Sequence, residues 1–370
     1  MKLAEAIALK KRTKLFVSAA ALGLAALLAV PAGLQVHAQR TFTRRAEAYA
    51  QEKLSAAAPA SATAALRLGD VNGDGSVDVT DARFALQTAA DLRTLEGNAL
   101  YAADFDCDDE VSLKEVRIIL RGAAGLGDIK AEAFGLSGSA VTASTEQALQ
   151  YYNFVCANLK TSRPGLTLER TYFTKFAGGV ENPFPWNLWP TSDYSKFEDN
   201  DDINALKGDT AEYTDAGAVV SYAPGEDLTD VYPSYGAVRG TLTALDVSAA
   251  SVTAGDGTYT ITITCPGASF PLPQNASQTQ LGKVFPMLTT KAQYRSQMLS
   301  SDYAAYAPYI TDISCEYGAC TLTCVVDAET DVLRSAVFSM PCTYRHDLSV
   351  DGKEITLDTA VRDFAAFTVG

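Results

Sequence analysis

The chain has little histidine, and this scarcity excludes most of the familiar routes to catalysis. Its 370 residues contain two histidines, of which only His346 lies beyond residue 38. A Ser–His–Asp or Cys–His arrangement would need His346 beside a nucleophile, yet Arg345-His346-Asp347 is typical of a surface histidine at a strand end. The sequence also contains no zinc-binding histidine pair, nucleophile elbow or glycine-rich phosphate loop. We find no catalytic constellation, and the sequence favours a non-enzymatic function.

Positive charge is also in short supply. Lysine and arginine number 30 against 44 acidic residues, which gives a net charge of -14 and an isoelectric point near 4.6. Nucleic acids and anionic membrane surfaces attract proteins with the opposite charge balance. The composition therefore argues against either as a partner.

Cysteine is present, but its pattern leaves its chemistry open. Cys107 lies in an acidic loop, at a position that we expect to point to solvent. The six others could form up to three disulfides in 15 possible pairings, or serve as buried small hydrophobic residues. Zinc is disfavoured because residues 315–324 alternate as strands do and have no partner histidine. The six are Cys156, Cys265, Cys315, Cys320, Cys324 and Cys342.

The most informative stretch begins at Asp70. Oxygen-bearing side chains occupy positions 1, 3, 5, 9 and 12 of a loop that has Gly75 at position 6. This spacing suits calcium, which takes oxygen ligands at about 2.3–2.6 Å, while the glycine permits the sharp reversal of the chain. The predicted ligands are Asp70, Asn72, Asp74, Asp78 and Asp81, with the backbone carbonyl of Ser76 at position 7.

The same pattern occurs again 34 residues later, together with the segment that follows it. The predicted ligands of this second loop are Asp104, Asp106, Asp108, Ser112 and Glu115, with the carbonyl of Glu110 at position 7. A repeat of this length indicates one supersecondary unit used twice. A run of solvated surface acids would not combine alternation, glycine placement and repetition, so we predict two Ca²⁺ sites.

Two such loops, each followed by a helix and separated by a third helical segment, resemble a dockerin of type I. The resemblance covers about 60 residues, which we assign as 66–127. Asp109 replaces the glycine at position 6 and must accept a positive φ, and Glu115 replaces the usual aspartate at position 12. We expect the first site to bind calcium more strongly than the second.

The resemblance implies a cohesin-like partner. Dockerins set partner choice at positions that here hold Val79 and Thr80 in the first repeat and Leu113 and Lys114 in the second. The two pairs differ in chemistry, so one docking face is expected to dominate.

Residues 1–38 are predicted to be a signal peptide or a signal anchor. A basic stretch, Lys10 to Lys14, precedes a mostly apolar run over residues 15–36, and Val36-His37-Ala38 fits a cleavage site. The apolar run is also long enough to span a bilayer without cleavage. Either way the chain after residue 38 is expected to be extracytoplasmic, secreted or anchored by residues 15–36.

A helix over residues 44–54 and an Ala/Ser/Pro spacer are expected within residues 39–65. Beyond a short hinge at 125–130, residues 131–370 predict an α+β domain with a helix over 145–159 on a curved antiparallel sheet. Strands are expected over residues 166–173, 218–222, 258–265, 312–315, 320–326, 332–345 and 355–367. The order of these elements resembles the half-barrel of bacterial lipoprotein-carrier domains.

Three other segments are candidates for ligand binding. Trp186 and Trp189 could stack on a sugar ring or line the mouth of an apolar pocket, although pinning an irregular loop to the core is the simpler explanation. The acidic run 198–202 could supply paired carboxylates for glycoside cleavage or a third calcium site, or be a solvated loop. The tyrosines at 303, 306 and 309 are expected to cover the sheet edge.

The sequence therefore predicts a multidomain protein with a small all-α calcium module and an α+β binding domain. The expected function is that of a non-catalytic assembly or binding subunit engaging a cohesin-like partner. Two alternatives remain open. One is a carbohydrate-active enzyme of polysaccharide breakdown, and the other is a surface receptor whose calcium repeats clamp the large domain from within.

Overall fold

A computed structural model of the chain describes residues 32–55, 66–176, 213–271, 310–350 and 353–370, together with the single positions 283, 292 and 296. Most of the predicted targeting segment lies outside these residues, as do the 56–65 spacer, both tryptophans, the acidic run 198–202 and the three tyrosines. Within the described ranges, no helix combines the length and the apolar character needed to cross a membrane.

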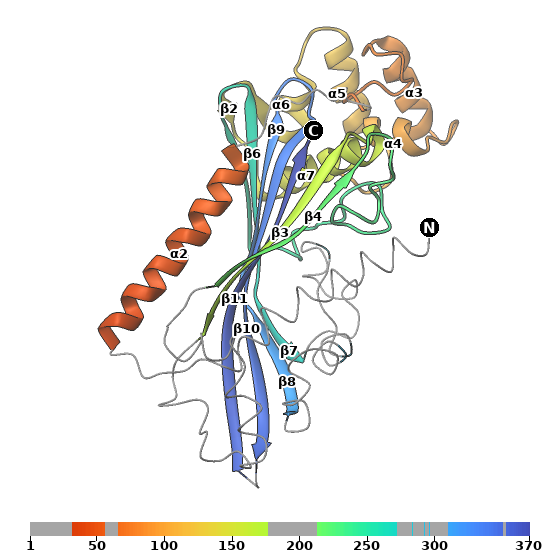
Figure 1. Cartoon of the computed structure of the whole chain (residues 1–370). Helices are drawn as coiled ribbons and strands as arrows, with labels where there is room; N and C mark the ends of the chain where they lie inside the picture. Colours follow the sequence, from red (N-terminus) through yellow and green to blue (C-terminus); the bar gives the residue numbers. More distant parts are fainter. Residues whose placement is uncertain are drawn as a thin grey trace.

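A large antiparallel sheet forms the body of the molecule (Figure 1). Its main path runs β4-β3-β11-β10-β9-β6-β5, and β8 and β7 continue beside the far half of β10. The bounds are β3 (Leu166–Phe176), β4 (Tyr213–Tyr222), β5 (Ala249–Ala254), β6 (Thr258–Cys265), β7 (Ala268–Pro271), β8 (Ile310–Tyr317), β9 (Cys320–Asp327), β10 (Leu333–Val350) and β11 (Lys353–Val369). The chain thus has the predicted α+β architecture.

The two long strands bury side chains on both of their faces. Successive strand residues point to opposite sides of a sheet. Accordingly Phe338 and Phe367 belong to the main core, whereas Val337 and Phe364 pack in a second cluster on the other face. Ala336 lies opposite Phe367 across the β10–β11 pair, which fixes this register. A slip of one residue would exchange the two faces.

The main core lies between the sheet and α7 (Thr145–Ser162), whose N-cap is Ser144. Ser144 and Gln147 form a capping box, and Arg163 ends the helix in the left-handed conformation at φ 47°. The helix is buried on all sides from Tyr151 to Lys160. A helix covered on every side needs a second layer besides the sheet, and residues 66–127 and 223–248 contribute to it.

The opposite face of the sheet is covered by α2 (Ala32–Ser55), shown in red in Figure 1. It contains the predicted 44–54 helix and begins twelve residues earlier. Ala46 is fully buried against the sheet, and Tyr49 Oη and Lys53 Nζ bond to Glu169 at 3.0 and 2.8 Å. The helix is therefore attached to the large domain.

The predicted loop–helix repeats form as α3 (Val79–Ala89) and α5 (Leu113–Ala123), with α4 (Gly97–Ala103) between them. The expected hinge is instead a packed segment leading into α6 (Ile129–Phe134). Ile129 lies directly against Gly69 and Gly122, where an added Cβ would approach it to 2.7 and 2.4 Å. One continuous core runs from the repeats into the sheet, because Leu68, Phe105 and Phe134 belong to the same cluster.

Two small additional strand pairs also help to define the fold. β1 (Leu136–Ser137) pairs with β2 (Ala140–Val141), and β7 pairs with β8. Of these strands, β8 contains the predicted 312–315 segment, whereas β1, β2, β5 and β7 were not predicted. His346 lies within β10, opposite Ile313, and not at the strand end that was expected.

Candidate metal centre

The first loop arranges its acids around its own backbone amides. Asp70 is buried and accepts bonds from the amides of Gly73, Asp74 and Gly75 at 2.8–3.1 Å. Asp81, fully buried, accepts from Val71 and Asn72 at 2.9 Å. The predicted ligands at the two ends of the loop are therefore fixed before any ion binds.

The remaining first-loop residues line the turn between these ends. Asn72 Nδ2 donates to Asp74 at 2.7 Å, and the Ser76 amide donates to Asp74 at 2.9 Å. Asp78 caps α3, and the amide of Thr80 donates to it at 2.6 Å. These backbone and side-chain bonds lower the pKa of Asp78, so its carboxylate remains ionised and able to bind a cation.

The second loop repeats the main features of this arrangement. Asp104 accepts from the amides of Cys107, Asp108 and Asp109 at 2.8–3.3 Å, as Asp70 does in the first loop. Glu115 takes the place of Asp81, accepting from the Ser112 amide at 2.9 Å and from its hydroxyl. The Glu110 amide donates to Asp108 at 2.9 Å.

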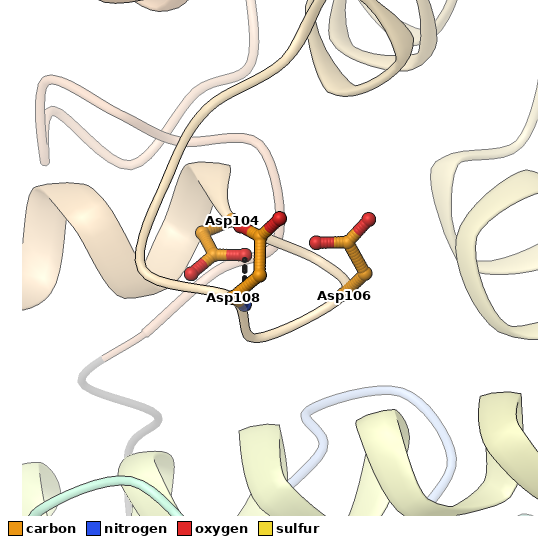
Figure 2. Close-up of side chains that lie close together, drawn as sticks. All are labelled: Asp104, Asp106 and Asp108. Carbon is orange, nitrogen blue, oxygen red and sulfur yellow. Dashed lines mark hydrogen bonds between the residues drawn. The ribbon is translucent and has the colours of Figure 1, made fainter.

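Three carboxylates of this loop lie close together (Figure 2). Asp104, Asp106 and Asp108 each offer an oxygen within 4.8 Å of the other two, and among the described residues they form the only such acidic group. Burial, followed by the charges of Glu115 and Asp108, raises the pKa of Asp106. Lys114 Nζ, at 3.7 Å from Asp106, is an exposed and weak counter-ion.

Two buried carboxylate oxygen atoms of the second loop are candidates to coordinate a cation. Glu115 is 1% exposed, and its Oε1 has no hydrogen-bond partner; the same is true of Asp106 Oδ1. An unpaired carboxylate oxygen is costly to bury unless it coordinates a metal. Oxygen donors in this number suit a hard cation such as Ca²⁺, so the residues present fit the ion that the sequence predicts.

The backbone shows how the second loop turns without its glycine. Asp109 takes a φ of 68° where Gly75 has 87°, as predicted. Cys107 takes 65° where Gly73 has 74°, which the sequence analysis missed. The expectation that Cys107 points to solvent is wrong. Its sulfur lies 3.9 Å from the Gln150 carbonyl of α7, and burial raises the pKa of the thiol to about 12.

A residue that the sequence analysis missed enters the second loop from the large domain. Arg239 Nη1 donates to Asp104 Oδ2 at 2.6 Å, and its Nη2 bonds to Asp109. Burial raises the pKa of Asp104, and the bond and charge of Arg239 partly offset this effect. No local pattern could have revealed this contact, because 135 residues separate the partners.

The predicted partner-binding positions are accessible on the surface of the repeats. Val79 and Leu113 are each 68% exposed, and each begins the helix that follows its loop. Thr80 and Lys114 follow them in the first turn. Four further exposed residues recur at the same 34-residue spacing, namely Leu86, Leu92, Leu120 and Leu126. We call these six apolar residues the repeat face.

The cysteines of the large domain offer no metal site in the described residues. All seven cysteines are free thiols, and all except Cys107 are buried. Burial raises the pKa of Cys156 to about 11 and that of Cys265 to about 12. They lie on α7 and the strands as small hydrophobic residues, one of the alternatives that the sequence left open.

Comparison with known proteins adds no relative. No protein-family model matches the chain. Neither a curated protein nor a solved structure matches it significantly.

Proposed function

We propose that this chain is an extracytoplasmic, non-catalytic binding protein whose calcium-loaded repeats engage a cohesin-like partner. The observation that carries the proposal is the repeat face. Of the eight large apolar side chains exposed among the described residues, six are Val79, Leu86, Leu92, Leu113, Leu120 and Leu126. They form three pairs related by the internal repeat, as a two-fold docking surface requires.

Single exposed apolar side chains are common, but six of them within one small module, recurring with its internal repeat, favour an interaction surface. Val79 and Leu113 begin α3 and α5, next to the loops in which the calcium ligands gather. Calcium would fix these helix starts and therefore the geometry of the repeat face. The dockerin resemblance supplies the class of partner.

Calcium would also stabilise the repeats themselves. Each loop gathers four or more acidic residues within twelve positions, and like charges at such distances repel. An ion that binds the folded loops and not the unfolded chain adds its binding free energy to folding. We expect the ion to be required for full stability of the folded protein.

A second role, the internal clamp, is favoured by the junction between the repeats and the large domain. Lys130 Nζ, from α6, pairs with Asp331 at 2.7 Å and bonds to the Ala328 carbonyl at 2.7 Å. The Leu66 amide donates to Asn158 of α7 at 3.3 Å. These buried contacts hold the repeats rigidly, so a partner bound on the repeat face would be oriented relative to the large domain.

Binding of the full chain to purified cohesin domains tests the proposal. Biolayer interferometry would compare calcium with chelator, and wild type with the double variant Val79→Asp, Leu113→Asp. We expect binding in calcium alone and its loss in the double variant. Leu245→Asp is the matched control, because Leu245 is 87% exposed on the large domain. Equal binding by the double variant would reject the repeat face as the docking surface.

A further inference from the structure

Asp70 and Asp104, at position 1 of the two loops, differ in how many of their hydrogen-bond acceptor sites are occupied. A carboxylate has about four lone-pair sites. Asp70 uses three of them on the amides of its own loop. Asp104 uses three in the same way and a fourth on Arg239. Asp70 therefore keeps acceptor capacity for an ion, whereas Asp104 is saturated.

Contacts with α7 hold the segment that carries Arg239. Lys160 Nζ, 2% exposed, donates to the carbonyls of Pro233, Ser234 and Ala237 at 2.8–2.9 Å. On the other side of Arg239, the Gly240 amide donates to the Asn153 carbonyl at 3.2 Å. Both anchors lie on α7, so the arginine is presented to the loop from a rigid helix.

The side chain itself is also confined. Arg239 is 8% exposed and lies over the ring of Tyr101 at 5.4 Å. In the first loop the nearest counterpart, Arg67, donates to the Gly75 carbonyl, and the bonds to the Asp70 carboxylate within the described ranges come from loop amides alone. The asymmetry between the loops is therefore specific to Arg239 and Asp109.

We propose that Arg239 is a tethered cation that competes with calcium for Asp104 in the second loop. The proposal rests on the calcium binding proposed above. An ion needs an acceptor site on Asp104, and Arg239 is the only one of its four donors that does not belong to the loop. Calcium binding at this loop therefore displaces the guanidinium, and Arg239 lowers the calcium affinity of the second site.

The displaced side chain has space to enter. A cleft of about 620 Å³ lies at the junction, lined by Asp106, Cys107, Asp109 and Arg239 on one side and by Glu146 and Asn153 of α7 on the other. Glu146 offers a carboxylate there. By linkage, the contact between Arg239 and Asp104 weakens calcium binding by the same factor by which calcium weakens that contact. Calcium binding at the second loop therefore changes the contact between this loop and the large domain.

Calorimetric titration of the full chain with CaCl₂ tests this competition. Arg239→Gln should raise the affinity of one of two sites about tenfold or more, because a charge-assisted bond to Asp104 no longer opposes the ion. Adding Glu115→Gln should remove the tightened site and so assign it to the second loop. Lys130→Met, which breaks the same junction away from any loop ligand, is the control and should leave both affinities unchanged.

Hydrogen exchange on the wild-type protein gives a readout that needs no variant to fold. Calcium should accelerate exchange of the amides in 238–242, since displacement of Arg239 loosens this segment. If both calcium affinities were unchanged in Arg239→Gln, or if calcium slowed exchange of these amides, the proposed competition would be wrong. The proposed function would not be affected by that result. Absence of calcium binding at both loops would overturn the competition and the proposed function together.

Discussion

Phe134 provides the sharpest test of whether the calcium repeats and the large domain form one cooperative unit. Its side chain is fully buried at the end of α6. Its ring lies 6.5 Å from Phe105 of the second loop, and 5.3 and 6.2 Å from Tyr151 and Phe154 of α7. Phe134→Ala would remove the aromatic link between the two parts and leave a cavity.

The expected cost follows from comparable substitutions. Truncation of a buried phenylalanine to alanine lowers the free energy of unfolding by about 3–5 kcal/mol. With an unfolding entropy of about 2.1 cal/mol/K per residue, this corresponds to a fall in melting temperature of about 4–6 °C for a 370-residue chain that unfolds as one unit. Because the ring contacts both parts, the whole chain should unfold in a single transition at the lower temperature.

Differential scanning calorimetry in saturating calcium would measure this change. Leu245→Ala is the control, because an 87% exposed side chain should change stability by less than about 0.5 kcal/mol. If the Phe134 variant gave two transitions, with that of the large domain at the wild-type temperature, the continuous core would not act cooperatively. The repeats would then be a flexible adaptor.

Three further predictions follow from buried groups. Burial raises the pKa of Asp363 to about 6, and Arg170 at 2.6 Å only partly offsets this rise. The folded protein therefore binds more protons than the unfolded chain between about pH 4 and 6, so this carboxyl makes stability fall as pH rises through that window. Asp363→Asn should reduce this dependence of the unfolding free energy on pH, measured by urea titrations at several pH values. An unchanged dependence would refute the assignment to Asp363. Cys156 and Cys265 should not react with a thiol reagent at pH 8 in the folded protein, because they are buried and their pKa values are raised; reaction before unfolding would contradict this. Lys160→Met should destabilise the protein by about 3 kcal/mol or more in urea, because three buried carbonyls lose their donor, and a change below about 1 kcal/mol would contradict the structural role.

Periodic patterns in the sequence predicted most of the fold. Thr258–Cys265 alternates along its whole length, and β6 has those bounds. The helix predicted over 145–159 forms as α7, which begins at Thr145 and extends to Ser162. Alternation also reveals that β10 and β11 are strands, but it could not show that both faces are covered, since α2 lies far away in sequence.

The sequence predicted which acidic residues gather in the candidate site, but not which residues of the large domain contact them. The spacing of Asp104, Asp106 and Asp108 is a local property, and the structure brings them together. Arg239 follows a loop that has no periodicity, and its contact depends on how α7 holds that loop. The integration of the repeats into the large core has the same origin, because Phe134 meets Tyr151 only in the folded chain.

The most direct test of the account is the number of calcium ions bound by the full chain, measured by native mass spectrometry in millimolar calcium. The account predicts two ions per chain and one ion after either Asp81→Asn or Glu115→Gln, with circular dichroism confirming that each variant is folded. A chain that binds no calcium while remaining fully folded would contradict it.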